Sequence, residues 1–389
     1  MFIYLFVFLV ALLFYFVSPK SKSDFLLAGL FCYMAIFVGL GDMIGGYDRY
    51  IYGDSFDTIA NNLRGIGKLQ DSLYLVSGSE YGYFLWEVIV ACFTPNRYIF
   101  ILITTLLVYA LYYRAFRKYM ETYPLPCILF VGFLFFFTMT YLRAVIAVGI
   151  LWQGVKYIWE RKLLKFSLVL LLAYSFHSSA MIVLPLYFMP QKKLSKSVVL
   201  KMLAVSLLIG LTPIPVSLLS SAGEVSGKLD SGLSYASQDQ GFRIEYVFEV
   251  LFIIWFIFKN YKYIKLDPKT LTFLNMSFIL CCVLLVFMRF GQGGRFTWPF
   301  FLGIFYLLPT LALNNSGMKY KKPILIFVSF ALFYRLVVAW APLNIPYKTF
   351  LVDGEPSGDG SVYQYYEYDV MYSKDKFYRP AFEPILFKK

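Results

Sequence analysis

Residues 166–189 read FSLVLLLAYSFHSSAMIVLPLYFM, and this stretch decides the fold because it is long and apolar enough to enter a membrane. It contains His177, the only histidine of the chain. An ionisable side chain at bilayer depth costs about 2–3 kcal/mol or more, and it is kept mainly where it does chemistry or lines a polar path. His177 is therefore the first candidate functional residue.

The composition of the whole chain agrees with a membrane environment. Of 389 residues, 59% are hydrophobic and only 15% are charged, and the mean hydropathy is +0.65. A water-soluble domain of this length does not have such a composition, whereas a polytopic membrane protein does. The aromatic content of 21% fits rings that face lipid or lie at the membrane interface.

Apolar segments separated by charged or Gly/Pro-rich breaks predict an all-α polytopic membrane protein with about 10–12 transmembrane or re-entrant helices. The first segment has neither a basic region before it nor a small-residue cleavage site, so we expect a retained span. The segments are 2–18, 24–40, 97–113, 124–140, 142–158, 166–189, 198–216, 244–258, 271–288, 296–313 and 323–341.

The distribution of charge predicts the orientation of these segments, because short basic loops stay in the cytoplasm. Six connections hold, in or beside them, 20 basic and four acidic residues, whereas the rest of the chain has 16 basic and 19 acidic residues. The net charge of +13 is therefore a topology signal and not a sign of nucleic-acid binding. The connections are Lys20–Lys22, Arg114–Lys118, Lys156–Lys165, Lys192–Lys201, Lys259–Lys269 and Lys319–Lys322.

Two segments need special treatment in this scheme. Segment 81–94 is short, and we interpret it as a re-entrant or interfacial helix. Segment 166–189 has basic flanks on both sides, so it is either one crossing against the charge rule or a hairpin that turns near His177, and we favour the hairpin. The transmembrane domain then covers 1–341, and 342–389 is a Tyr-rich extracytoplasmic tail.

In this topology four arginines fall at the external face, against the positive-inside tendency: Arg143, Arg289, Arg295 and Arg335. The planar guanidinium binds two phosphate oxygens at once and never loses its charge. Each arginine alone could snorkel to the interface or pair with an acid. As a set near His177, they indicate a site for a diphosphate headgroup, with Tyr141 beside Arg143 as a further contact.

His177 is a candidate general base near neutral pH, or else a core histidine bonded to Ser178 or a carbonyl. It is a poor metal ligand, because the chain has no second histidine and no Cys/Asp/Glu cluster at ligand spacing. No Gly-x-Ser-x-Gly elbow supports a hydrolase. In the outer stretch 45–52, Asp48 and Arg49 stand among glycines and tyrosines, which suit a carbohydrate contact or an ordinary turn.

Three stretches together resemble the EpsG family of exopolysaccharide biosynthesis proteins, the Wzy-like polysaccharide polymerases. They are Gly46–Asp48 (GYD) followed by tyrosines, Leu142–Ala147 (LRAVIA), and Ala173–Ala180 (AYSFHSSA), the last two joined through Trp159–Phe166 (WERKLLKF). The similarity covers about residues 1–310. Two positions depart from the family pattern: Ala144 stands where a Gln usually follows the Arg, and Gly41 and Asp42 stand where an Arg usually precedes the loop Asp.

The resemblance implies a glycosyltransferase-C-like helical enzyme of the bacterial inner membrane. It would join undecaprenyl-diphosphate-linked repeat units at the periplasmic face, as an O-antigen or capsule polymerase does. Arg143, His177 and Asp48 match the family's motif positions. The implied partners are the lipid-linked glycan, membrane lipid and a chain-length regulator, with no nucleic acid, nucleotide sugar, ATP, metal or other cofactor.

Other functions remain open at this point. A flippase for lipid-linked oligosaccharide would also use arginines in a membrane cavity, although we find no inverted repeat. An O-antigen-ligase-type transferase would use similar chemistry with another acceptor. A membrane acyltransferase would need a histidine, usually with a nearby Asp, which is not evident.

Overall fold

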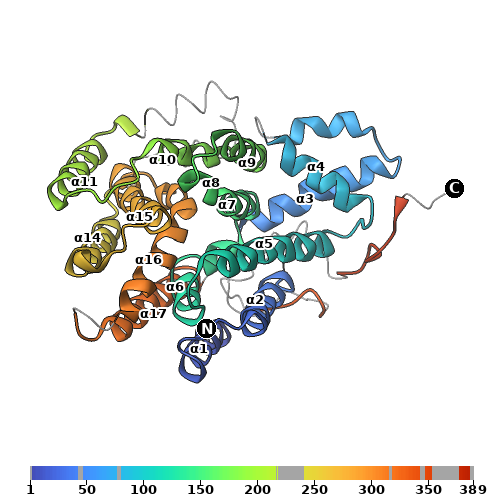
Figure 1. Ribbon diagram of the computed structural model, residues 1–389. Helices are drawn as coiled ribbons and strands as arrows, with labels where there is room; N and C mark the ends of the chain where they lie inside the picture. The colour runs from blue at the N-terminus through green and yellow to red at the C-terminus, as the bar shows by residue number, and fades with distance from the viewer. Residues whose placement is uncertain are drawn as a thin grey trace. The chain divides into compact units, whose positions relative to one another are not determined.

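The computed structural model describes residues 2–42, 47–76, 80–215, 217, 241–314, 318–341, 347–352 and 376–385. These residues are helical and include no β-strand, only a single antiparallel bridge between Gly41 and Thr349 (Figure 1). Each apolar segment predicted from the sequence contains a helix. The all-α prediction is therefore confirmed for the part of the chain that is described. Most of the predicted tail, with its tyrosine cluster, lies outside the described residues.

The helices are, in chain order, α1 (Phe2–Val17), α2 (Asp24–Gly39), α3 (Tyr47–Leu63), η1 (Leu69–Leu75), α4 (Tyr81–Ala91), α5 (Arg97–Tyr119), α6 (Pro124–Phe133), η2 (Phe135–Met139), α7 (Leu142–Gly154), α8 (Lys156–Trp159), α9 (Leu163–Phe176), η3 (Ser178–Val183), α10 (Leu184–Phe188), α11 (Lys196–Gly210), α14 (Ile244–Lys259), η4 (Tyr261–Tyr263), α15 (Pro268–Val286), η5 (Gly293–Phe300), α16 (Phe301–Leu313) and α17 (Lys321–Ala339).

Within the described ranges, four helices are long and apolar enough to cross a membrane: α5, α15, η5 with α16, and α17. Shorter apolar helices accompany them, including α1, α2, α4, α6 and α9. An α-helix rises about 1.5 Å per residue and a bilayer core is about 30 Å thick, so α4 with 11 residues cannot span it. The structure thus supports a membrane protein in which some apolar helices are too short for a full crossing.

The chain forms two compact units. The first comprises Met1–Gly149, Ser175–His177 and Ile326–Lys389. Its core is aromatic: the ring of Phe31 stacks on Phe130 at 5.5 Å between centroids and also contacts Tyr109 and Phe116. These contacts hold α2 against α5 and α6, and α3 packs beside α4 and α5 in the same unit.

The second unit comprises Ile150–Tyr174 and Ser178–Leu325. Helix α15 lies at its centre and packs against α11, α14 and α16. Within this unit, Trp152 is fully buried and its indole nitrogen donates to the carbonyl of Pro299 at 2.9 Å. Buried indole nitrogens need such a partner, so this bond fixes the end of α7 against η5.

Basic connections meet at one end of each unit. In the first, Arg117 at the end of α5 pairs with Asp24 at the start of α2. In the second, Lys193 donates to the carbonyl of Tyr261, and Gln191 donates to the carbonyl of Ile158 at 3.1 Å. The loops that the sequence places together by charge are therefore also neighbours within each unit.

Candidate functional site

Helix α9 ends at Phe176, and His177 stands between it and η3. The ring of Phe166, near the start of α9, stacks on Tyr187 of α10 at 5.3 Å between centroids. Arg161 donates hydrogen bonds to the carbonyls of Tyr187 and Met189. The chain therefore folds back on itself, which confirms the hairpin interpretation of segment 166–189, and the partly buried His177 lies at the turn.

Arg143 is the second residue of α7, and its guanidinium contacts one carboxylate and two aromatic rings. Its Nη1 donates to Oε2 of Glu80 at 2.7 Å, and its guanidinium lies over the rings of Tyr52 at 5.3 Å and Tyr83 at 6.0 Å. A helix N-terminus disfavours a positive charge, so the position is electrostatically strained unless an acid compensates it. Glu80, whose side chain is 3% exposed, supplies that compensation.

Helix α4 presents one polar face toward Arg143. Glu80, Tyr83 and Glu87 recur at spacings of three and four residues, which is one side of a helix, and all three are buried. The indole nitrogen of Trp86 donates to the hydroxyl of Thr104 on α5 at 3.0 Å and fixes the rotation of α4. The polar face cannot turn away without breaking that bond.

The deepest group on this face is Glu87. It is 2% exposed, and the hydroxyl of Ser55 on α3 hydrogen-bonds its carboxyl. Among the described residues, Oε1 of Glu87, the hydroxyl of Tyr83 and Nε of Arg143 have no hydrogen-bond partner. Burial disfavours the charged carboxylate and raises the pKa of Glu87 to about 8.

The turn of the hairpin lies against the start of α4. Gly82 is so close to Ser175 that an added Cβ would stand 2.2 Å from its Oγ and 3.0 Å from its Cβ. Ser175 precedes His177 by two residues, and Gly82 follows Glu80 by two. Arg143 and His177 thus belong to one unit, and the start of α4 contacts both Arg143, through Glu80, and the turn that carries His177, through Gly82 and Ser175.

The other predicted residues of this unit have different surroundings. The ring of Tyr141 contacts Trp340 at 6.2 Å and Phe137 at 6.3 Å. Arg335 is exposed on α17. Asp48 stands in the first turn of α3, in a polar helix that the sequence analysis does not predict.

Arg49 is fully buried, and its guanidinium donates to three backbone carbonyls at the end of α2. The acceptors are Val38 at 2.6 Å and Gly41 and Asp42 at 3.3 Å. These bonds satisfy carbonyls that a helix C-terminus leaves open. Its contacts are those of a structural residue, so our proposal does not use it as a substrate ligand.

Arg289 and Arg295 belong to the second unit. Arg289 donates to the carbonyl of Leu211 at 3.1 Å and lies over the ring of Phe242 at 5.1 Å. Both arginines are partly buried on either side of Gly293. A Cβ at Gly293 would stand 2.3 Å from the carbonyl oxygen of Phe287, so this turn requires glycine.

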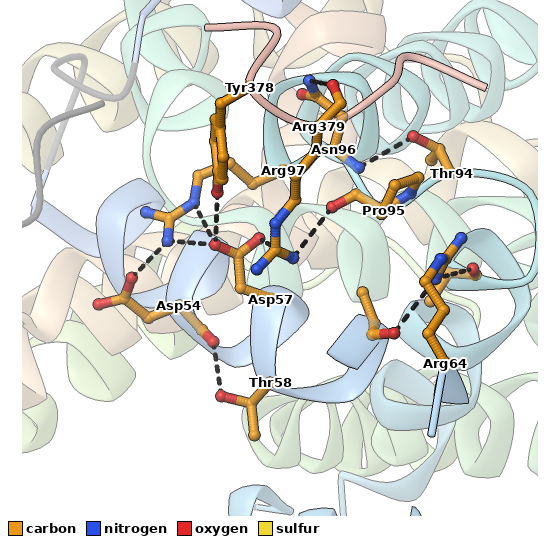
Figure 2. Close-up of polar contacts among 12 residues, drawn as sticks. Asp54, Asp57, Thr58, Arg64, Thr94, Pro95, Asn96, Arg97, Tyr378 and Arg379 are labelled. Atoms are coloured by element: carbon orange, nitrogen blue, oxygen red, sulfur yellow. Dashed lines mark hydrogen bonds and ion pairs between the residues drawn. The ribbon is translucent and has the colours of Figure 1, made fainter. Parts of the chain in front are cut away.

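A second polar cluster of the first unit holds the end of the chain (Figure 2). Arg97 pairs with Asp54 at 2.9 Å and with Asp57, and Asp57 also accepts from the hydroxyl of Tyr378 at 3.1 Å. Arg379 pairs with Asp57 at 3.3 Å. The described tail residues therefore dock onto α3 and the start of α5.

A buried ion pair completes this docking. Nζ of Lys376 lies 3.1 Å from Oδ2 of Asp42, with side chains 0% and 1% exposed. Asn96 donates to the carbonyls of Lys376 and Arg379, both at 2.9 Å. A buried charge is costly without a partner, so these contacts fix residues 376–379 firmly on the first unit.

Sequence reasoning missed Glu80, Glu87, Tyr52 and Tyr83 as neighbours of Arg143. Glu87 carried a usable signal, because it is the only Asp, Glu, Lys, Arg or His of the apolar segment 81–94. The rule that marks His177 as functional applies equally to a carboxyl in such a segment. The tyrosines carried no signal, since the chain has 33 of them.

Comparison with known protein families adds one finding to this geometry. The model of the EpsG family matches residues 24–351, which includes Arg143, His177 and their neighbours. Neither the curated proteins nor the solved structures gave a match. A match over most of the chain shows that this protein belongs to the EpsG family, whose members are membrane proteins of polysaccharide synthesis.

Proposed function

We propose that this protein is a polysaccharide polymerase, which joins undecaprenyl-diphosphate-linked oligosaccharide repeat units at the outer face of the bacterial inner membrane. The observation that carries the proposal is the placement of Arg143 and the His177 turn at the same end of α4. A glycosyltransferase-C-like architecture would suit this role, with the glycan's lipid between the apolar helices and the tail on the outer face.

Arg143 suits the leaving group. Its guanidinium is paired with Glu80 and also hydrogen-bonds Tyr52, but 30% of the side chain is exposed, so the guanidinium is accessible to an anion. The N-terminus of α7 adds its partial positive charge at the same place. A diphosphate oxygen bound there would be stabilised as it gains charge, which is usually the largest catalytic contribution.

His177 suits the proton transfer. The acceptor hydroxyl would give its proton to the imidazole while its oxygen bonds to the anomeric carbon of the donor. The bond from that carbon to the diphosphate oxygen breaks, and its electron pair stays on the diphosphate. Arg289, Arg295 and Asp48 remain proposed substrate contacts, as do Tyr141 and Arg335.

The test is a deletion strain that receives the gene variants on a plasmid. We expect Arg143→Ala and His177→Ala to abolish long-chain polymer and to accumulate single lipid-linked repeat units. The matched control is Arg117→Ala, because Arg117 is an exposed arginine paired with Asp24 away from the site. It should give normal chain lengths.

Each alternative predicts another outcome. A flippase variant would remove repeat units from the outer leaflet instead of accumulating them there. A ligase variant would accumulate finished polymer that has not reached its final acceptor. Normal chain lengths in both Arg143→Ala and His177→Ala, with the protein still in the membrane, would overturn the proposed mechanism.

A further inference from the structure

Arg143 lies near two carboxyl groups of α4 but bonds only one of them. Glu80 accepts from the guanidinium at 2.7 Å, whereas Oε1 of Glu87 has no hydrogen-bond partner within the described chain. Glu87 is buried like Glu80 and lies two helical turns further along the same face. Glu80 therefore neutralises Arg143 directly, whereas Glu87 does not form an ion pair with it.

Glu87 is neutral in this environment for a simple reason. An ionised carboxylate that is 2% exposed and lacks a paired cation would cost several kcal/mol, so the group keeps its proton instead. The hydrogen bond from Ser55 and the positive charge of Arg143 both favour the anion, but burial outweighs them. Consistently, burial raises the pKa of Glu87 to about 8.

The charge of Glu87 determines how strongly the positive charge of Arg143 attracts an anionic ligand. With Glu87 neutral, the guanidinium and Glu80 balance, and the exposed part of the guanidinium and the α7 N-terminus remain attractive to an anion. With Glu87 ionised, the group formed by Arg143, Glu80 and Glu87 carries one more negative charge than positive ones. An incoming diphosphate is then repelled, because a like charge nearby is unfavourable in a low-dielectric site.

We propose that Glu87 is a positioning residue of the polymerase site, which must carry its proton for Arg143 to bind the diphosphate of the lipid-linked donor. This inference rests on the proposed function, since it assumes that Arg143 holds the diphosphate. Glu87 acts through Arg143 and does not itself touch the reacting atoms.

Other titratable groups surround Glu87 and have to be separated from it. Arg143 on α7 and Tyr83 on α4 interact electrostatically with Glu87, and Tyr52 and Glu80 interact in turn with Tyr83. Arg97 on α5 is a further nearby cation of the same unit. Arg97 is neutralised by Asp54 and Asp57. Burial raises the pKa of Tyr83 above its usual value of 10.0, so its proton is retained when Glu87 titrates.

The experiment uses the full-length protein in liposomes, with lipid-linked repeat units purified from the deletion strain as donor. The KM for this donor should be flat below the pKa of Glu87 and rise above it by roughly tenfold per pH unit. Glu87→Gln mimics the protonated carboxyl and should remove this alkaline rise. Glu87→Asp keeps a titratable group and should retain it.

Further variants make the result specific. Glu87→Ala should raise KM at every pH, because the hydrogen bond to Ser55 and the packing are lost, and Glu87→Gln should rescue it. Glu121→Gln, an exposed acid in a connecting loop, should behave as the native protein. An unchanged alkaline rise in Glu87→Gln would overturn the inference, even with Arg143→Ala inactive. Activity in Arg143→Ala would instead overturn the proposed function.

Discussion

At the scale of single residues, Gly82 controls the distance between the two halves of the proposed site. A Cβ there would meet Ser175 at 2.2 Å from Oγ and 3.0 Å from the backbone oxygen, so Gly82→Ala must push the hairpin turn away from α4. A misplacement of about 1 Å can reduce a rate by up to 100-fold. We expect Gly82→Ala to shorten the polymer and lower its rate of formation about tenfold.

Two further variants test this reason. Gly82→Ala combined with Ser175→Gly removes Oγ and Cβ, the side-chain atoms of the clash and Oγ its closest one, and it should restore most of the rate. Gly29→Ala places the same methyl group on α2, where nothing lies within 4 Å, and it should leave the polymer unchanged. A double variant as slow as Gly82→Ala would show that the contact with Ser175 is not the cause.

The site shows how far single residues can be interpreted from sequence. His177 and Arg143 could be proposed as site residues from the sequence, because each places an ionisable group in an apolar stretch. Arg49 was predicted as a substrate contact from its glycine and tyrosine neighbours, yet it bonds the carbonyls at the end of α2. Sequence alone cannot separate the two cases, because a buried arginine satisfied by backbone and one facing a ligand leave the same pattern.

At the scale of elements, the hairpin 163–189 depends on Arg161 at its open end. Arg161 has a φ of 55° and donates to the carbonyls of Tyr187 and Met189. Hydrogen bonds from a charged donor are stronger than neutral ones, and the bond to Tyr187 is partly buried. We expect Arg161→Ala to open this end and to lower the melting temperature in detergent, with faster proteolysis near residue 190.

The neighbouring Lys162 provides the control. It pairs with Glu160 at 2.9 Å on the surface, where its side chain is 51% exposed, and such pairs contribute little. Lys162→Ala should melt as the native protein does. Equal proteolysis of the Arg161 and Lys162 variants would show that the hydrogen bonds of Arg161 do not hold this end of the hairpin closed.

Elements were predictable where they are apolar and not where they are polar. Every apolar segment contains a helix, because burial of an apolar run in a membrane requires internally satisfied backbone groups. Helix α3 was missed, since its charged and polar residues resemble a loop. Its helical face becomes visible only in the structure, where Tyr52, Phe56 and Ile59 are buried together and Phe56 stacks on Phe100 at 4.3 Å.

At the scale of the whole chain, the ion pair of Asp42 and Lys376 joins positions more than 300 residues apart. Removing one partner of a buried pair costs about 3–5 kcal/mol, because the other charge is left unpaired. We expect Lys376→Met to lower the melting temperature markedly. The double variant with Asp42→Asn should recover part of the loss, and a double variant that melts lower than Lys376→Met would contradict this account.

The orientation of the chain is the last property that its charges predict. The basic connections meet at one end of each unit, and the His177 turn lies one α9 length, about 21 Å, from the Arg161 end of its hairpin. Basic loops stay in the cytoplasm. In a cysteine-free background, Lys22→Cys and Leu266→Cys should react with a membrane-impermeant maleimide only after permeabilisation.

Gln292→Cys and Leu351→Cys should react in intact cells, because the connection at 292 and the described tail segment at 351 fall on the outer side of the predicted topology. All four positions are exposed in the structure. A cysteine that fails to react in intact cells is therefore shielded by the membrane and not by the fold of the protein. The reverse pattern would turn the His177 hairpin toward the cytoplasm. Polymerisation at the outer face would then be impossible, since no lipid-linked glycan on that side could reach both Arg143 and His177.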